Sequence, residues 1–177
     1  MADILWAPWR LDYIRSVSGD GKNCFLCDLA LAPQLDQSNL VVARTPDCML
    51  LMNRYPYVNG HLLIAPYRHV PDLTELSLTE RTALMELTTH AQKILHQAMN
   101  PQGFNIGINI GRCAGAGVVG HVHIHVVPRW SGDINFMTVV GQVRVIPQAV
   151  EEAFRQLSKA HAEFISTSAS APPANAP

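Results

Sequence analysis

The chain has 177 residues, a net charge of −1 and a composition that is 48% hydrophobic and 15% charged. These values indicate one lightly charged globular domain with a sizeable core, and they disfavour sequence-independent binding to nucleic acid or to anionic membranes. No apolar run reaches the roughly eighteen residues of a membrane span, and the N-terminus lacks the basic and apolar regions of a signal peptide. Four cysteines suit a reducing compartment, so we expect a cytoplasmic protein.

The N-terminal part predicts a docking segment and two short helices. Residues 5–10 hold two tryptophans around a proline, and such aromatic density favours docking on the body of the domain. Residues 10–16 and 26–31 are compatible with short helices. The turn-forming residues 19–23 separate them and lead into the pair Cys24-Phe25-Leu26-Cys27.

The middle of the chain predicts three strands, a long helix and a fourth strand. The first three strands are expected at residues 40–44, 48–53 and 61–65. Ser77 and Glu80 have the spacing of a capping box, and apolar residues then recur at helical spacing until Asn100.

The fourth strand is expected at residues 104–110, where the sequence alternates between apolar and small or polar residues. One face would carry Phe104, Ile106, Ile108 and Ile110. The other would carry Asn105, Gly107 and Asn109. The glycine-rich loop at residues 111–117 follows directly.

Three histidines alternate with β-branched residues in Gly120-His121-Val122-His123-Ile124-His125-Val126-Val127-Pro128-Arg129. In a strand the three histidines share one face, roughly 6.5–7 Å apart, while Val122, Ile124 and Val126 can enter a core. A single strand histidine is commonly a polar surface residue. Three in strict alternation, out of eight in the chain, indicate a function.

The C-terminal part predicts one more strand or strap, a second main helix and a tail. The strand is expected at residues 139–146 and the helix from Pro147, with Val150, Ala153, Phe154 and Leu157 on its apolar face. Residues 166–177 are rich in Ser, Ala and Pro without periodicity, which predicts a disordered tail. We expect His90, His96 and His161 to be solvated helix positions.

Cys24 and Cys27 have the spacing of zinc ligands, although a redox pair would show the same spacing. A closed zinc site commonly adds two imidazoles to two thiolates. One histidine of the alternating segment, together with His61 or His69, would complete such a site.

The alternating histidines also suit nucleophilic catalysis on phosphorus. A neutral imidazole is a competent nucleophile when a hydrogen bond to its other nitrogen fixes the tautomer. Backbone amides of the loop at residues 111–117 can donate to a phosphate. Asn105 and Asn109 are candidates for sugar or phosphate contacts.

The segment His121-Val122-His123-Ile124-His125-Val126-Val127 resembles the signature of the histidine triad (HIT) superfamily of nucleotide hydrolases and transferases. Leu51-Met52-Asn53-Arg54-Tyr55-Pro56 and Gly60-His61-Leu62-Leu63-Ile64-Ala65-Pro66-Tyr67-Arg68-His69 resemble its earlier strand pair. Residues 5–10 and 129–137 look like the branch that includes bacterial diadenosine tetraphosphate hydrolases and phosphorylases. The resemblance covers roughly residues 5–160, so we expect a single HIT-like domain at residues 1–165.

The resemblance implies a role for several residues. His123 matches the nucleophile that takes a nucleotidyl group from the α-phosphate, and His125 matches a phosphate-contacting histidine. His61 matches a histidine near both. The implied substrate-binding residues are Asn53 at the ribose, Asn109, and Gly115 and Gly117 of the glycine loop.

In zinc-containing members of the superfamily the ligands match Cys24, Cys27, His69 and His121, and the metal is expected to be structural Zn²⁺. The chain departs from many members just before the triad, where Ala116, Gly117 and Val118 replace Gln and Ser or Thr side chains that contact phosphate. The handling of the leaving group and the acceptor, water or inorganic phosphate, is therefore open.

We expect an α+β fold with an antiparallel sheet of about five strands and two helices, assembled as a homodimer. The main functional hypothesis is an enzyme that cleaves a phosphoanhydride of a dinucleoside polyphosphate through a covalent intermediate on His123. A phosphorylase, a non-catalytic nucleotide-binding module and a hydrolase with three histidines on one catalytic metal are the alternatives.

Overall fold

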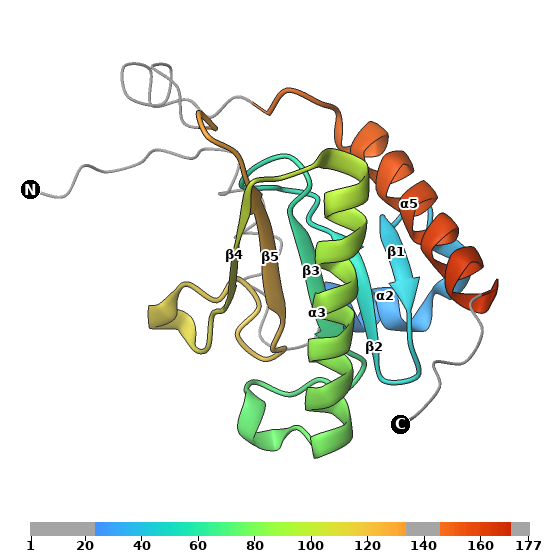
Figure 1. Cartoon of the computed structure of the whole chain (residues 1–177). Helices are drawn as coiled ribbons and strands as arrows, with labels where there is room; N and C mark the ends of the chain where they lie inside the picture. The colour runs from blue at the N-terminus through green and yellow to red at the C-terminus, as the bar shows by residue number, and fades with distance from the viewer. Residues whose placement is uncertain (1–23, 134–145, 171–177) are drawn as a thin grey trace, which may run out of the picture.

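The computed structural model of the chain describes residues 24–133 and 146–170. These residues form an α+β fold, in which helices pack on both faces of a five-stranded antiparallel sheet (Figure 1). The predicted docking segment at residues 5–10, the short helix at residues 10–16 and nearly all of the strand at residues 139–146 lie outside the described residues.

The sheet places the histidine-bearing strand next to its edge. Its strands are β1 (Val41–Arg44), β2 (Cys48–Met52), β3 (Leu62–Pro66), β4 (Gly103–Ile108) and β5 (Ile124–Arg129). Their order is β1-β2-β3-β5-β4, and every neighbouring pair is antiparallel. His125 therefore lies opposite Leu63 of β3 on one side and Gly107 of the edge strand on the other.

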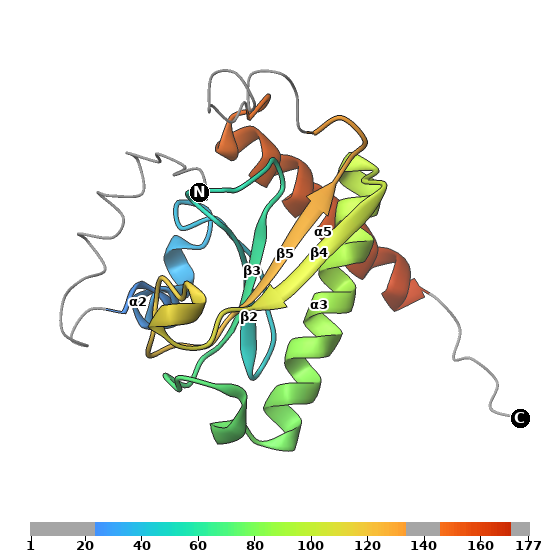
Figure 2. The ribbon, with the colours of Figure 1, turned by 90° about the vertical axis from the view of Figure 1, so that its left-hand side faces the viewer.

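Within residues 24–133 and 146–170, three α-helices cover the sheet. They are α2 (Phe25–Leu31), α3 (Leu78–Met99) and α5 (Val150–Ser170), and single turns of 3-10 helix form η1 (Pro33–Leu35), η2 (Leu73–Glu75) and η3 (Arg112–Ala114). Helices α3 and α5 lie on one face and α2 on the other (Figure 2). None of the described helices is long and apolar enough to cross a bilayer.

The predicted capping box begins helix α3. The Ser77 hydroxyl accepts from the Glu80 backbone N–H, and the Glu80 carboxylate accepts from the Ser77 N–H. These bonds satisfy two of the backbone donors that the first turn of a helix leaves unpaired. The helix ends at Asn100, which adopts the left-handed conformation at φ 45°.

Alternation along the central strands builds two separate cores. Leu50 of β2 and Ile64 of β3 point toward α3 and α5, whereas Leu51 and Leu63 point toward α2. Because β2 and β3 are covered on both faces, their sequences are continuous apolar runs. The α2 core takes its strand residues from β1, β2 and β3. Side chains of β5 and β4 on that face, His125 among them, instead line a pocket.

Strands β5 and β4 each differ from the sequence prediction. Strand β5 begins at Ile124, so His121 and His123 precede the strand that was expected to hold all three histidines. The Val122 N–H donates to the Val70 carbonyl at 2.7 Å and not to a neighbouring strand. Val122, Ile124 and Val126 still enter the α3 and α5 core as predicted. On the edge strand the expected apolar face is only partly buried. Phe104 and Ile108 pack on that core, while Ile106 is 44% exposed.

Helix α5 runs five residues past the predicted start of the tail, so residues 166–170 are helical. Packing of Ala153, Phe154 and Leu157 stabilises the first turns of α5. A helix stabilised in this way can continue through alanine and serine at little cost, because propagation is easier than nucleation. The remainder of the predicted tail lies outside the described residues.

His90 of α3 and His161 of α5 are not the solvated positions that the sequence predicted. Nε2 of His90 lies 2.8 Å from Nδ1 of His161, and Phe164 packs edge-on against the His90 ring. Burial lowers the pKa of His90 to about 4, with smaller contributions from His161 and Lys93. The pair therefore joins the two helices in its neutral form.

We expect the His90 pair to make stability depend on pH. An unfolded histidine has a pKa near 6.5, so between about pH 6.5 and pH 4 the unfolded chain binds more protons, and stability falls as pH falls through this range. The variant His90→Gln should flatten the dependence of Tm on pH in that window. The matched control His96→Gln, which removes a histidine that packs on Phe104, should retain the wild-type slope. An unchanged slope in His90→Gln would contradict the assignment.

Candidate active site and metal site

His61 is positioned by a turn that requires glycine. Gly60 has φ +75°, and a Cβ at this position would lie 2.8 Å from Sδ of Met99 and 3.1 Å from Cδ2 of Leu95. Both the conformation and the close approach of α3 exclude a side chain. The turn delivers His61, fully buried, to the start of β3.

Hydrogen bonds fix the proton positions on His61 and His125. Nδ1 of His61 accepts from the Tyr57 backbone N–H at 3.1 Å, so the ring proton of neutral His61 is on Nε2. That nitrogen lies 3.0 Å from Nδ1 of His125 and donates to it. His125 in turn carries its proton on Nε2. His125, which lines the pocket, therefore presents an N–H donor at Nε2.

His123 is held in the opposite tautomer. Its Nδ1 lies 2.9 Å from the carbonyl oxygen of His121, which can only accept, so Nδ1 carries the proton and Nε2 carries the lone pair. The side chain is buried, and burial lowers its pKa while the hydrogen bond to His121 opposes that shift. His123 is therefore a neutral imidazole with an unprotonated Nε2, which is the form a nucleophile needs.

The three imidazoles form one cluster. The ring centroids of His123 and His125 are 4.9 Å apart, and those of His61 and His125 are 5.2 Å apart. Burial, followed by the nearby His125 and His123, lowers the pKa of His61 to about 3. A second positive charge in this cluster is disfavoured, so His61 stays neutral near pH 7.

The predicted substrate-binding residues lie in three different places. Asn109 lines a pocket of about 440 Å³ together with His125. Asn53 contacts His61 at 3.3 Å through its Nδ2, while its Oδ1 accepts from the Tyr55 N–H. Gly115 and Gly117 lie in the connection between β4 and β5, and among the described residues they do not line this pocket.

Tyr57 is a site residue that sequence reasoning missed. Its ring centroid lies 4.6 Å from that of His61 and 5.9 Å from that of His125, and its backbone fixes the His61 tautomer. A tyrosine in a turn between strands gives no periodic signal. Only its position four residues before His61 could have indicated the contact.

The four predicted metal ligands come together on the α2 side of the sheet. Sγ of Cys24 lies 3.3 Å from Nδ1 of His121, and Sγ of Cys27 lies 3.3 Å from Nδ1 of His69 and 3.5 Å from Nδ1 of His121. All four ligand atoms lie within 4.8 Å of one another. Of the two candidates that the spacing left open, His69 joins this cluster and His61 joins the other.

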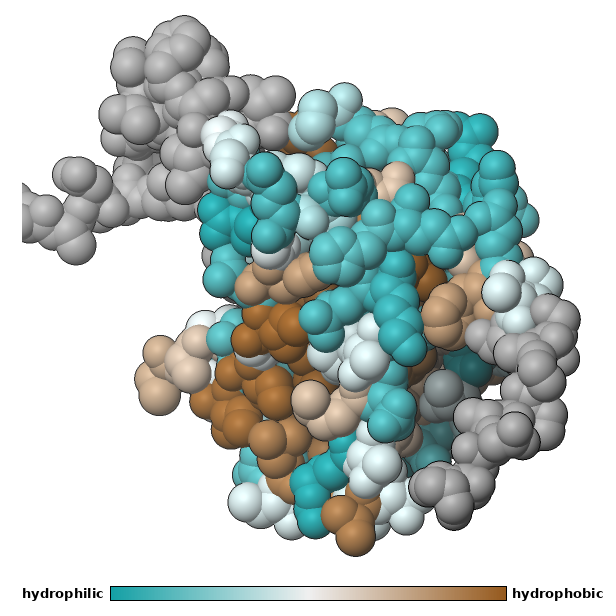
Figure 3. All heavy atoms as spheres, viewed as in Figure 1, coloured by the Kyte–Doolittle hydropathy of each residue, from teal (hydrophilic) through white to brown (hydrophobic). Residues whose placement is uncertain are grey.

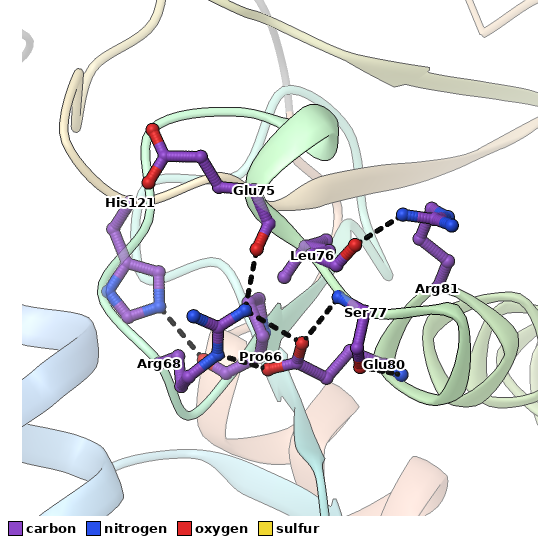
Figure 4. Close-up of polar contacts among 8 residues, drawn as sticks. All are labelled: Pro66, Arg68, Glu75, Leu76, Ser77, Glu80, Arg81 and His121. Atoms are coloured by element: carbon purple, nitrogen blue, oxygen red, sulfur yellow. Dashed lines mark hydrogen bonds and ion pairs between the residues drawn. The ribbon is translucent and has the colours of Figure 1, made fainter.

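Backbone and ionic contacts orient the two metal-site histidines. Nε2 of His121 donates to the Pro66 carbonyl at 2.8 Å, which leaves Nδ1 unprotonated for a metal (Figure 4). Arg68, which precedes His69, forms a salt bridge with Glu80, the capping residue of α3. The segment after β3 is thereby tied to the start of the long helix.

The chemistry of this donor set fits zinc. Burial, and then the neighbouring Cys24, raise the pKa of the Cys27 thiol to about 11. Two adjacent thiolates are therefore unfavourable without a cation between them, and a bound metal would reverse this preference. Two sulfurs and two imidazole nitrogens are the ligands of closed tetrahedral zinc sites.

Comparisons with known proteins agree with this fold and site. The HIT domain model matches residues 34–132. An AP-4-A phosphorylase of Mycobacterium tuberculosis is 40% identical over 159 residues, which cover 87% of this chain and 82% of the relative. The asymmetrical bis(5'-nucleosyl)-tetraphosphatase of Schizosaccharomyces pombe is 35% identical over 95 residues, 54% of this chain and 52% of the relative.

A solved structure is also similar. The Zn-bound histidine triad family protein of Mycobacterium smegmatis superposes with a TM-score of 0.67 at 26% identity, covering 82% of this chain and 97% of that one. Fold and site together define a histidine triad protein, and the family model covers more than half of the chain. The chain therefore belongs to the HIT family.

We expect a substitution at Gly120 to disturb the metal site selectively. A Cβ at this position would lie 2.7 Å from Nε2 of His69, a ring that can move aside only when no metal holds it. Gly120→Ala should therefore weaken zinc binding by roughly 10–100-fold, as measured by competition with a chromophoric chelator. The control Gly103→Ala adds a Cβ in open space and should bind zinc like the wild type. Equal zinc affinity in both variants would show that His69 does not bind the metal.

Proposed function

We propose that this HIT-family enzyme is a phosphorylase of dinucleoside polyphosphates that converts diadenosine tetraphosphate and inorganic phosphate into ADP and ATP. The observation that carries the proposal is the tautomer of buried His123, whose unprotonated Nε2 is set by the His121 carbonyl. The likeness to an AP-4-A phosphorylase favours phosphate over water as the final acceptor.

The reaction would take two displacements at one phosphorus. Nε2 of His123 attacks the α-phosphorus, the bond to the bridging oxygen breaks, and ATP leaves with the bond's electron pair. An oxygen of inorganic phosphate then attacks the same phosphorus, the P–N bond breaks, and ADP is released. The hydrogen bond from Nδ1 to the His121 carbonyl stabilises the positive charge that develops on the ring during the first step.

Neighbouring residues would support these steps. His125, protonated on Nε2 because His61 donates to its Nδ1, would donate to the phosphate. Asn53 would contact the ribose beside His61, and Asn109 would contact the phosphate chain from the pocket wall.

The connection between β4 and β5 would supply the remaining phosphate contacts. Backbone amides near Gly115 and Gly117 would serve as donors. Gly115 has φ +86°, and a Cβ there would meet open space. Ala116 and Gly117 present little side-chain bulk where many family members carry longer polar groups. A loop of this kind would leave room for phosphate as the acceptor.

Product analysis tests the proposal directly. With diadenosine tetraphosphate we expect ADP and ATP in equal amounts, formed only when inorganic phosphate is present, as separated by anion-exchange chromatography. AMP and ATP formed without phosphate would instead establish asymmetric hydrolysis, the activity named for the Schizosaccharomyces pombe relative. Binding without any product would favour a nucleotide-binding module.

Substitution of the triad histidines should separate their roles. His123→Asn should lower turnover by at least ~10⁴-fold because covalent catalysis is lost, while nucleotide binding persists. His125→Asn should lower kcat by roughly 10²–10³-fold, as for one charge-stabilising donor. His121→Asn should mainly lower zinc content and Tm.

The intermediate itself can be captured. A phosphoramidate is labile in acid and stable in base, so wild-type enzyme with labelled substrate should be quenched in alkali before peptide mapping. The label is expected on His123. Label on His125, or substantial activity in His123→Asn, would overturn the assignment.

We further propose that zinc has a structural role. Cys24, Cys27, His69 and His121 supply four ligands, which leaves no position for a reacting water. When bound, the metal would hold α2 against the segment that carries His123.

Cys24→Ser should therefore lose zinc and Tm together, as measured by metal analysis and thermal denaturation. If the metal-free protein instead kept its Tm, lost all turnover and regained it with other divalent ions, the metal would be catalytic.

The proposed assembly is a homodimer that pairs through β4. This strand forms one edge of the described sheet, and an edge presents unpaired backbone groups. Ile106 on the strand and Ile110 just after it are 44% and 42% exposed. Apolar side chains gather on the side of the molecule where β4 lies (Figure 3). A second copy of the chain would cover both features.

A further inference from the structure

The pocket at His125 continues along the sheet well beyond the reacting histidines. Its lining runs from Tyr57 and His125 across β4 and β5 to Arg129 and Asp133. His125 and Arg129 lie on the same face of β5 four residues apart, a separation of roughly 13 Å. The pocket is therefore long enough to hold more of the substrate than the phosphate that reacts with His123.

In the middle of the pocket the surface is formed by backbone, because the residue there is a glycine. Gly107 lies opposite His125 in the β4–β5 ladder, and a Cβ at Gly107 would meet no atom within 4 Å. Val127 of β5 contributes an apolar wall. A backbone surface beside an apolar side chain suits the flat ring of a nucleobase better than a chain of phosphates.

The far end of the pocket carries polar groups with no net charge. The Arg129 guanidinium donates to both carboxylate oxygens of Asp133, at 2.5 and 2.9 Å, and to Oδ1 of Asn105 at 2.7 Å. The negative charge of Asp133 offsets the positive charge of the Arg129 guanidinium, so this end is a poor site for a phosphate. The bond from Arg129 also turns the Asn105 amide so that its NH₂ group faces away from the guanidinium. A carboxylate acceptor beside amide and guanidinium donors suits the hydroxyls and ring edges of a nucleoside.

We propose that this extension of the pocket binds the nucleoside of the leaving nucleotide, the half of a dinucleoside polyphosphate that is not transferred to His123. The proposal rests on the proposed function for the identity of the substrate. The subsite would make the enzyme prefer substrates that carry a second nucleoside over those whose phosphate chain ends free. Gly107, Asn105 and the Arg129–Asp133 pair determine this preference.

The test compares two substrates that differ only in the second nucleoside, diadenosine tetraphosphate and adenosine 5′-tetraphosphate. The wild type should show the higher kcat/KM for the dinucleotide. Gly107→Val places a strand-compatible side chain in open space and should lower the ratio of the two kcat/KM values by roughly tenfold or more. Asn105→Ala, a milder change on an exposed residue, should lower the same ratio through a higher KM for the dinucleotide.

Gly103→Val is the matched control, because Gly103 lies on the same strand, outside the pocket, with no atom within 4 Å of an added Cβ. This variant should retain the wild-type ratio. An unchanged ratio in both Gly107→Val and Asn105→Ala, or an equal loss for both substrates, would overturn the subsite. A wild-type enzyme that releases no ATP from diadenosine tetraphosphate would instead refute the proposed function.

Discussion

Fixed backbone groups set the proton positions of the site, and the rest of the chemistry depends on this constraint. A carbonyl oxygen can only accept and an amide can only donate, so each bonded imidazole has one possible neutral tautomer. The His121 carbonyl fixes His123, the Tyr57 amide fixes His61, and the Pro66 carbonyl fixes His121. None of these partners titrates. The position of the lone pair on Nε2 of neutral His123 is therefore set by the fold, and burial lowers the pKa at which the ring would be protonated.

The same chain segment serves the metal site and the reacting cluster. His121 points its Nδ1 at Cys24 and Cys27, while its carbonyl holds His123 two residues later. A zinc ion that fixed His121 would also fix the acceptor of the His123 hydrogen bond. A bound metal would in this way couple the two sites through the backbone of His121.

Unequal coverage of the sheet explains where a ligand can bind. Helices α3 and α5 form one continuous core with all the inner strands, whereas the core under α2 draws its strand residues from β1, β2 and β3. On this second face β5 and β4 present His125, Gly107 and Arg129 to a pocket. Among the described residues, the strand side chains that α2 does not cover are therefore the ones available to a ligand.

The sequence by itself determined most of the helices and strands, the candidate residues for metal and for phosphate, and the family resemblance. Period-two and period-3.6 patterns report which side chains are apolar, and the α+β fold, the capping box at Ser77 and the core positions of Val122, Ile124 and Val126 follow from them. The Cys24–Cys27 spacing is that of zinc ligands, and a redox pair would share it. Such signals are local, so the sequence carries them without knowledge of the tertiary structure.

Only the tertiary structure decided which distant groups meet. Spacing could not choose between His61 and His69 as a ligand on its own, because the choice depends on which groups lie at each end of strand β3, which His61 precedes and His69 follows. The start of β5 at Ile124 depends on a hydrogen bond to Val70, and the burial of His90 depends on His161 of another helix. The contacts of Tyr57 with His61 and of Arg129 with Asn105 and Asp133 likewise come from loops and strand pairing. These outcomes are set by long-range packing and by backbone donors and acceptors, which the identity of a single residue does not encode.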